Sequence, residues 1–366
     1  SGLMIFNTTA IYFRNLNNDI PNWSIIDSLI GLFNWLPFFI IFWGLQPYLK
    51  SNKNREIFSI CIVSGSIPII FTAIGQYFFK WHGPFELYGL ITWFQRPLAF
   101  NDGVTGLFNN PNYAGAWLSL VWPFSLEIFL RKNNNKTKKI ISGSISLSIL
   151  FTALLTLSRN TFIGLSITLI LSISFKFFLV ILFLFIFLKI TILILLIIVK
   201  IGLITTIADL STSNFENIIN FNYLYSFPRI EIWFNSLSLI SQRIWTGWGP
   251  TSFQTLFKSR YPGLNIQHTH NIVLELAHNF GVPLAIVISL FVFYLILKSY
   301  KIVSKRFDNN QLINKFWMIS ILVIFISHFF DIAYYDGRFN TISWIILAGI
   351  MCIIEENKIR PKEDIN

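Results

Sequence analysis

Long apolar runs recur along this chain, and they restrict the folds that it can adopt more than any other feature. Each run of roughly 17 residues or more is long enough to cross the hydrocarbon layer of a bilayer as a helix. Hydrophobic residues make up 54% of the 366 and charged residues only 12%, a balance far from that of a soluble domain. The runs lack the short alternating pattern of an outer-membrane barrel. The sequence therefore predicts an all-α polytopic membrane protein.

The apolar runs predict about nine transmembrane helices. They cover Ile25–Leu45, Ile57–Phe79, Ala114–Leu130, Ile140–Leu157, Thr161–Phe175, Phe177–Val199, Asn271–Leu297, Phe316–Phe330 and Thr341–Ile354. A large polar loop interrupts them, and we expect amphipathic helices within it. Three regions follow: an N-terminal transmembrane bundle at 1–204, the large loop at 205–270, and C-terminal transmembrane helices with a charged tail at 271–366.

Positive charge is concentrated in particular loops. The segments rich in Lys and Arg are 46–56, 131–139, 298–315 and the C-terminal tail. Because Lys and Arg favour the cytoplasmic side, these segments are predicted to be cytoplasmic. Alternation of the spans then places 80–112, Arg159, 205–270 and 331–340 together on the opposite face, where we expect the chemistry. The same rule accounts for the net charge of +11 without a nucleic-acid partner.

Two arginines on this opposite face are candidates for binding an anionic substrate. Arg159 directly follows an apolar run, and it is either an anchor for lipid headgroups or a cation that binds the substrate. Arg229 and Trp233 have helical spacing, so they share one face of a helix that Pro228 is suited to begin. An arginine fork matches a diphosphate because it donates two parallel hydrogen bonds. The alternative for this pair is an amphipathic helix lying on the membrane surface.

Histidines gather where the large loop meets the next apolar run. His270 is the candidate general base, since an imidazole with an ordinary pKa near 6.5 is the usual group for activating a hydroxyl. Asn271 beside it is a candidate substrate-binding residue. A zinc site that uses His268, His270 and His278 is the alternative. Neither a cysteine nor an HExxH motif accompanies these histidines, so we predict that no metal is bound.

Two further motifs lie on the same face. The motif GWGP predicts a tight turn in which glycine allows a positive φ or the close approach of a ligand, so Gly247 and Gly249 are candidate substrate contacts. Arg338 is a third candidate. Asp331 and Asp336 precede it, and for these aspartates an ion-pair turn is favoured over catalysis. The sequence contains neither a Walker motif nor GxSxG, and we expect no cofactor.

The motifs, taken in order, resemble the O-antigen ligase/polymerase superfamily. They are GLFNNPNYAGAWL, LTLSRN, RIEIW, GWGPTSF, HTHNIVLELAHNFG and WIILAG, and the resemblance covers roughly Asn101 to Gly349. Members of this superfamily take a glycan from an undecaprenyl-diphosphate carrier on the periplasmic side of the bacterial inner membrane. They transfer it to lipid A-core, a growing glycan or a protein hydroxyl, without metal or nucleotide.

The resemblance assigns roles to three residues of this chain. Arg159 falls in the SR motif, Arg229 in the RxxxW motif and His270 in the HN motif, so these are the expected catalytic residues. Members of the superfamily usually have about twelve spans. The smaller number predicted here therefore implies further N-terminal helices.

The resemblance implies a metal-independent, inverting glycosyltransferase of lipopolysaccharide or polysaccharide biosynthesis. Its expected partners are an undecaprenyl-diphosphate-linked glycan donor, a glycan or lipid acceptor and the lipid bilayer. The alternative is a membrane transporter or an accessory protein for inorganic-carbon uptake, because GLFNNPNYAG also resembles cyanobacterial members with that proposed role. A transporter should carry polar residues at mid-membrane depth. Few ionisable residues lie at that depth here, with Lys189 the main one, and this favours the enzyme.

The loop charges predict the result of a labelling experiment on intact cells. Cysteines introduced at Asn222 and Lys258 should react with a membrane-impermeant thiol reagent, whereas a cysteine at Asn134 should not. The reverse pattern would show that the orientation is inverted and would remove the argument for a periplasmic site.

Overall fold

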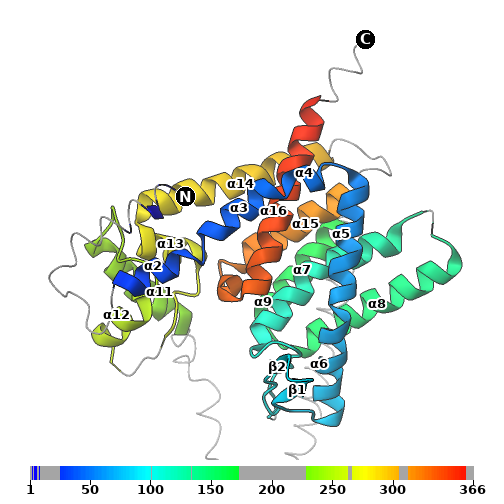
Figure 1. The fold of residues 1–366 in the computed structure, drawn as a ribbon, viewed down its shortest axis with the longest axis horizontal. Helices are drawn as coiled ribbons and strands as arrows, with labels where there is room; N and C mark the ends of the chain where they lie inside the picture. The colour runs from blue at the N-terminus through cyan, green and yellow to red at the C-terminus, as the bar shows by residue number, and fades with distance from the viewer. Residues whose placement is uncertain are drawn as a thin grey trace, which may run out of the picture. The chain divides into compact units, whose positions relative to one another are not determined.

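The computed structural model describes residues 2, 4, 5, 8, 25–99, 101–132, 134–172, 228–262, 266–304 and 312–359. Its contacts divide the chain into two compact units. The first comprises residues 1–168 and 232–366, and the second comprises residues 169–231. The positions of the two units relative to each other are not determined. Nearly all the described elements belong to the first unit, and most of them are helices (Figure 1).

Six segments of the described chain are long and apolar enough to cross a membrane. They are Ile26–Gly44, Asn52–Phe79, Pro111–Leu130, Lys136–Leu155, Val282–Ser304 and Gly337–Lys358. The helices within them are α2 (Ile25–Leu32), α3 (Leu36–Gly44), α5 (Asn52–Gly65), α6 (Ile67–Phe79), α7 (Pro111–Leu130), α8 (Lys136–Leu155), α14 (Val282–Ser304) and α16 (Gly337–Ile359). The predicted class of an α-helical polytopic membrane protein is confirmed.

Shorter elements complete the described part of the chain. The helices are α4 (Gln46–Leu49), α9 (Arg159–Ser172), α11 (Pro228–Gln242), α12 (Ser252–Arg260), α13 (Ile272–Phe280), the apolar α15 (Leu312–Ser327) and the 3₁₀ helix η4 (Ala333–Tyr335). Strands β1 (Phe85–Leu87) and β2 (Ile91–Trp93) form an antiparallel hairpin. The predicted span Phe177–Val199 and the first part of the large loop lie outside the described residues. The total of about nine spans therefore stays a prediction.

The prediction of one continuous helix from Asn271 to Leu297 is wrong. Helix α13 ends at Phe280, and α14 begins at Val282. Gly281 between them has φ 87° and ψ 158°, a combination that residues with a side chain essentially never adopt. The apolar pattern continues through the break because burial on both sides of Gly281 requires the same residue types. A periodicity argument therefore misses the change of direction.

Helix α7 has a central position in the first unit. It packs against α8, α15 and α5, while α16 packs against α3, α14 and α15. Glycine permits the close contact between α15 and α16, because a Cβ at Gly349 would lie 2.0 Å from the ring of Trp317. Ser320 on α15 donates a hydrogen bond to the backbone oxygen of Leu120 on α7, at 2.7 Å. This packing brings the end of α15 close to the candidate site.

The polar segments that were predicted to share the active face lie together. Val104 donates its backbone N–H to the carbonyl oxygen of Leu155 at the end of α8, at 3.1 Å. Arg338 donates to the carbonyl oxygen of Leu107, also at 3.1 Å. These contacts join the segment 80–112 to the neighbourhood of Arg159 and to the segment 331–340.

The segments predicted to be cytoplasmic are also in contact with one another. Arg55, whose side chain is fully buried, forms an ion pair with Glu356 at 2.8 Å. Arg131 pairs with Glu56 at 3.2 Å. Within the described residues, these ion pairs join the loop 46–56 to the segment 131–139 and to the C-terminal end of α16. The assignment of these segments to the cytoplasm stays a prediction.

Gly281 should be sensitive to the smallest possible substitution. Gly281→Ala should lower the free energy of unfolding by about 1–3 kcal/mol, since alanine is strained at this φ and ψ and its Cβ would lie 2.3 Å from the carbonyl oxygen of Trp245. Thermal unfolding of the purified protein in detergent measures the loss. Gly337→Ala is the matched control, because a Cβ at Gly337 meets nothing within 4 Å. Equal melting temperatures for the two variants would contradict this account of the break.

Candidate active site

The C-terminal end of α15 joins two motifs that are far apart in the sequence. The last carbonyl groups of a helix have no donor within the helix and need partners from outside it. Asn160, which follows Arg159, donates its side-chain N–H to the carbonyl oxygen of Ser327 at 3.1 Å. The backbone N–H of Ile272 donates to the carbonyl oxygen of His328 at 2.9 Å. The SRN and HTHN motifs therefore meet at one helix end.

Asn271 uses both ends of its side-chain amide within the protein. Its oxygen accepts hydrogen bonds from the backbone N–H groups of Val273 and Leu274, which makes Asn271 the N-cap of α13. Its nitrogen donates to the carbonyl oxygen of Phe329 at 3.1 Å. These contacts give Asn271 a structural role. The predicted contact of Asn271 with substrate stays a prediction.

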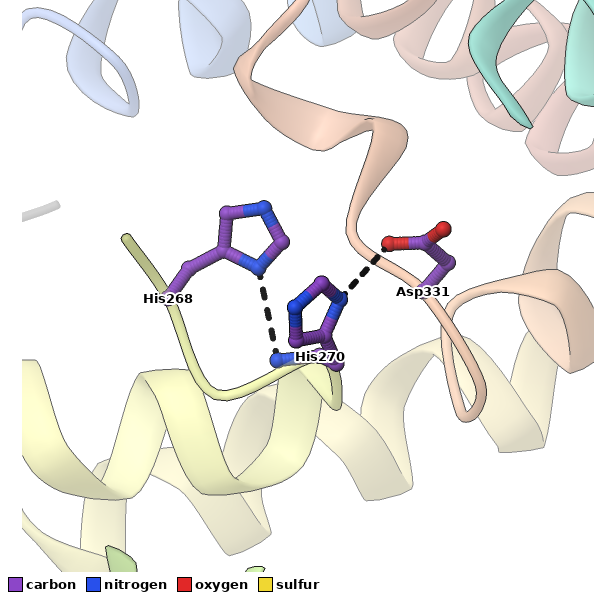
Figure 2. A group of neighbouring side chains, drawn as sticks. All are labelled: His268, His270 and Asp331. Atoms are coloured by element: carbon purple, nitrogen blue, oxygen red, sulfur yellow. Dashed lines mark hydrogen bonds and ion pairs between the residues drawn. The ribbon is translucent and has the colours of Figure 1, made fainter. Parts of the chain in front are cut away.

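His270 is paired with a carboxylate that lies just beyond α15. Its Nδ1 is 3.0 Å from Oδ1 of Asp331, and the side-chain exposures are 27% for His270 and 6% for Asp331. An ionised carboxylate only accepts, so a neutral imidazole paired with it would carry its proton on Nδ1 and present a lone pair on the other ring nitrogen. That second nitrogen points away from Asp331 (Figure 2). A partly exposed imidazole held in this way is suited to act as a base.

The backbone of His270 is itself unusual. Its φ is 55°, a left-handed conformation that is uncommon for residues other than glycine. Such strain persists only where the surroundings enforce it, and it is concentrated at functional sites. His268 contributes to the surroundings, because its Nδ1 accepts the backbone N–H of His270 at 3.4 Å. The two rings lie edge to face, with their centroids 4.3 Å apart.

One group of three side chains in the described part of the chain could hold a metal ion. His268, His270 and Asp331 each offer one ligand atom, and these atoms lie within 4.8 Å of one another (Figure 2). Two nitrogens and one oxygen would suit zinc. In the present arrangement the Nδ1 atoms of both histidines already take part in hydrogen bonds. The hydrogen-bonded pair accounts for the geometry without an ion, and the predicted lack of a metal stays a prediction.

A buried carboxylate holds the histidine loop from the other side. Glu275, on α13, accepts hydrogen bonds from the backbone N–H of Thr269 at 3.0 Å and from the hydroxyl of Tyr335 at 2.5 Å. The side-chain amide of Asn279 donates to it at 3.4 Å. Burial raises the pKa of Glu275, although these hydrogen bonds oppose the shift. The sequence gives one signal for this role, a carboxylate inside an otherwise apolar helix.

The two predicted arginines lie in different units of the structure. Arg159 is the first residue of α9 and is exposed, so neither interpretation of its side chain is excluded. Arg229 is half-buried on α11, which begins at Pro228 as the sequence predicts. Arg229 belongs to the unit 169–231, so its convergence with Arg159 and His270 stays a prediction. Trp233 follows on the same helix and is half-buried.

The GWGP motif forms the predicted tight turn, and the turn packs against α13. Gly247 and Gly249 have φ values of 71° and 99°. The backbone N–H groups of Trp248 and Gly249 donate to the carbonyl oxygens of His278 and Asn279 at 2.7 and 3.1 Å. A Cβ at Gly247 would lie 2.5 Å from the first of these oxygens. The close approach that glycine permits is therefore to the chain itself, and the predicted substrate contacts stay a prediction.

The expected ion-pair turn is present, but only one of the two aspartates takes part in it. Arg338 binds Asp336 through two hydrogen bonds, at 2.6 and 3.1 Å. Its guanidinium also lies 4.0 Å from the ring centroid of Phe108. Arg338 is 52% exposed, which leaves it accessible to a ligand. Asp331 pairs instead with His270, a contact that the sequence argument did not predict.

Residues 143–289 match the family model of the O-antigen ligases. This segment, about two fifths of the chain, is similar to an O-antigen ligase domain. This match confirms the predicted resemblance to the O-antigen ligase/polymerase superfamily. The matched segment includes Arg159, Arg229 and His270, whereas Asp331 and Arg338 follow it in the sequence. A comparison with curated proteins gave no match.

Glu275 offers a test of the loop that carries His270 in the matched segment. Glu275→Ala should abolish most of the activity that depends on His270, because the Thr269 N–H would lose its acceptor. Glu275→Gln should retain much of it, since an amide oxygen can still accept from Thr269 while its NH₂ group donates to Tyr335. Activity and thermal stability of both variants provide the measurement. Equal activity of the alanine variant and the native protein would contradict a role in positioning His270.

Proposed function

We propose that this chain is a membrane glycosyltransferase that moves a glycan from an undecaprenyl-diphosphate carrier to an acceptor hydroxyl, as an O-antigen ligase or a glycan polymerase. The observation that carries the proposal is the contact of 3.0 Å between His270 and Asp331, at a histidine that lies within the segment matching the O-antigen ligases. The active face would be the periplasmic face of a bacterial inner membrane.

The pair accounts for the activation of the acceptor. The unprotonated ring nitrogen of His270 would remove the proton of the acceptor hydroxyl, and the oxygen would attack the anomeric carbon of the glycan. Asp331 would hold the ring and stabilise the imidazolium that forms, as a carboxylate does beside a catalytic histidine. The bond from the anomeric carbon to the diphosphate oxygen would break, with inversion. Undecaprenyl diphosphate would leave as the anion.

The two arginines would act on the leaving group. A guanidinium can donate two parallel hydrogen bonds to phosphate oxygens, and it offsets the negative charge that develops as the sugar bond breaks. Arg229 and Arg159 would share this role. With cations and a histidine base supplied by the chain, the reaction would need no metal. The alternative of a transporter or a carbon-uptake accessory protein has no support from the domain match.

Substitutions at three positions separate these roles. His270→Ala should reduce transfer by about 10²–10⁴-fold, the usual loss when a general base is removed, while binding of the donor is nearly unchanged. Asp331→Asn should cause a large loss as well, because the ring would no longer be held against a charged partner. Arg229→Lys should lose most of the activity although the charge is kept, since an ammonium group lacks the fork.

The measurement is transfer by purified protein from an undecaprenyl-diphosphate glycan to candidate acceptors, with a chelator present. Arg260→Lys is the matched control, because Arg260 is exposed at the end of α12 and donates a hydrogen bond to the Gln242 side chain. Native rates in the His270 and Arg229 variants would contradict the assigned roles. Loss of transfer on chelation would indicate a metal at His268, His270 and Asp331. Uptake of a small solute into proteoliposomes, without any transfer, would favour the transporter.

A further inference from the structure

Helices α11 and α12 form a small helical hairpin, residues 232–260, with its own apolar core. The core consists of Ile232, Leu239, Trp248, Phe253, Leu256 and Phe257, all of them buried. Trp248 also donates its ring N–H to the carbonyl oxygen of Leu239 at 2.8 Å. The α11–α12 hairpin therefore has a buried apolar core of its own, formed without its exposed apolar side chains.

A second set of apolar side chains on the hairpin points outward. Phe234 and Leu237 on α11 are 69% and 49% exposed, and Ile244 and Trp245 just after the helix are 45% and 77% exposed. At 3.6 residues per turn, Phe234 and Leu237 are separated by roughly 60° around the helix. Several large exposed apolar side chains within a dozen residues indicate that something apolar covers this part of the hairpin.

Two contacts attach the hairpin to segments that cross the membrane. The carbonyl oxygen of Ile244 accepts the backbone N–H of Val282 at 2.8 Å, and Val282 is the first residue of the candidate span α14. The second contact is between Pro250 of the hairpin and Gly31, which lies in the candidate span Ile26–Gly44. The two residues are so close that a Cβ at Gly31 would lie 2.5 Å from the Cβ of Pro250. The exposed pair Ile244 and Trp245 is therefore fixed where a span begins, and tryptophan is enriched at that depth.

The charges of the hairpin fit a lipid surface. Lys258 and Arg260 are in the last turn of α12 and are exposed. Cationic side chains beside an exposed apolar face are typical of helices that lie in the plane of a membrane, where they contact lipid phosphates.

We propose that the α11–α12 hairpin lies on the surface of the same membrane that the spans cross, with Phe234, Leu237, Ile244 and Trp245 inserted between the headgroups and the acyl chains. Phospholipid covers this face, rather than a partner protein, because Ile244 is bonded to the first residue of a span and its face borders the bilayer. Lys258 and Arg260 contact lipid phosphates. The inference is independent of the chemistry at His270.

The attachment has a consequence for the site. The turn after α11 donates hydrogen bonds to the carbonyl oxygens of His278 and Asn279 at the end of α13, and His270 precedes the first turn of that helix. The depth at which the hairpin sits in the lipid surface therefore sets the height of His270 above the membrane. A site held in this way reaches groups that are attached to lipids.

Spin labels test the proposal on the full chain in lipid nanodiscs. The background lacks the two cysteines, Cys61 and Cys352, and single cysteines replace Phe234, Leu237 or Trp245. Gln242 is the matched control, because it is exposed on the same helix and lies roughly 80–140° around from the two apolar positions. Collision rates with oxygen, which enters the acyl region, and with a nickel chelate, which stays in water, report the depth of each label.

Labels at the three apolar positions should collide mainly with oxygen, and the label at Gln242 mainly with nickel. Each label replaces one of the apolar side chains that are proposed to insert into the membrane. A second variant therefore tests the contribution of two of these side chains with the label at a third position. Phe234→Ser combined with Leu237→Ser should shift a label at position 245 several-fold towards nickel. Equal nickel accessibility at all four positions would overturn the proposal. Protection of the apolar positions from both reagents would overturn it in favour of a protein partner or a second copy of this chain.

Discussion

The hydrogen bonds accepted by backbone carbonyl groups at the C-terminal end of α15 (Leu312–Ser327) are the constraint on which the candidate site depends. A buried helix end must find donors outside the helix, because an unpaired backbone carbonyl in an apolar environment is costly. Ser327 accepts the backbone N–H groups of Phe330 and Asp331 and, in addition, the side-chain N–H of Asn160, whereas the start of α13 supplies donors to His328 and Phe329. Asn160 lies 167 residues away from Ser327 in the sequence. A requirement of backbone chemistry therefore fixes two remote motifs against each other.

The same helix end supplies the chemistry as well as the attachment. Asp331 lies four residues beyond Ser327. The chain that follows α15 therefore places a carboxylate beside the loop that carries His270, which is hydrogen-bonded to the same helix end. The His270 ring is then held by Asp331, while His268 accepts the backbone N–H of His270 and Glu275 accepts that of the preceding Thr269. Each of these groups restrains an imidazole that is itself partly exposed. Rigid support around one accessible nitrogen is the arrangement that a proton-transfer reaction requires.

The sequence predicts the class of the fold and most of the described spans, because length and apolar composition decide whether a helix can cross a bilayer. It also makes His270 a candidate, since a histidine at the edge of an apolar run stands out. It does not reveal Asp331 as the partner of His270, because these two residues, 61 positions apart in the sequence, are brought together only by packing. It also misses Gly281, since the apolar pattern is the same on both sides of the break. Patterns report burial, whereas backbone direction and long-range pairing depend on individual hydrogen bonds.

The hydrogen bond between Ile244 and Val282 closes residues 245–281 into an excursion whose two ends meet, at 2.8 Å. The GWGP turn, α12 and His270 all lie within this excursion. A segment that leaves and returns at one point can change in length or sequence without moving the helices on either side of it, because the entropy of loop closure varies only slowly with length. Under the proposed function, substrate preference would diverge within a fixed membrane scaffold, and the excursion would be the natural unit to exchange between relatives in building a chimeric protein.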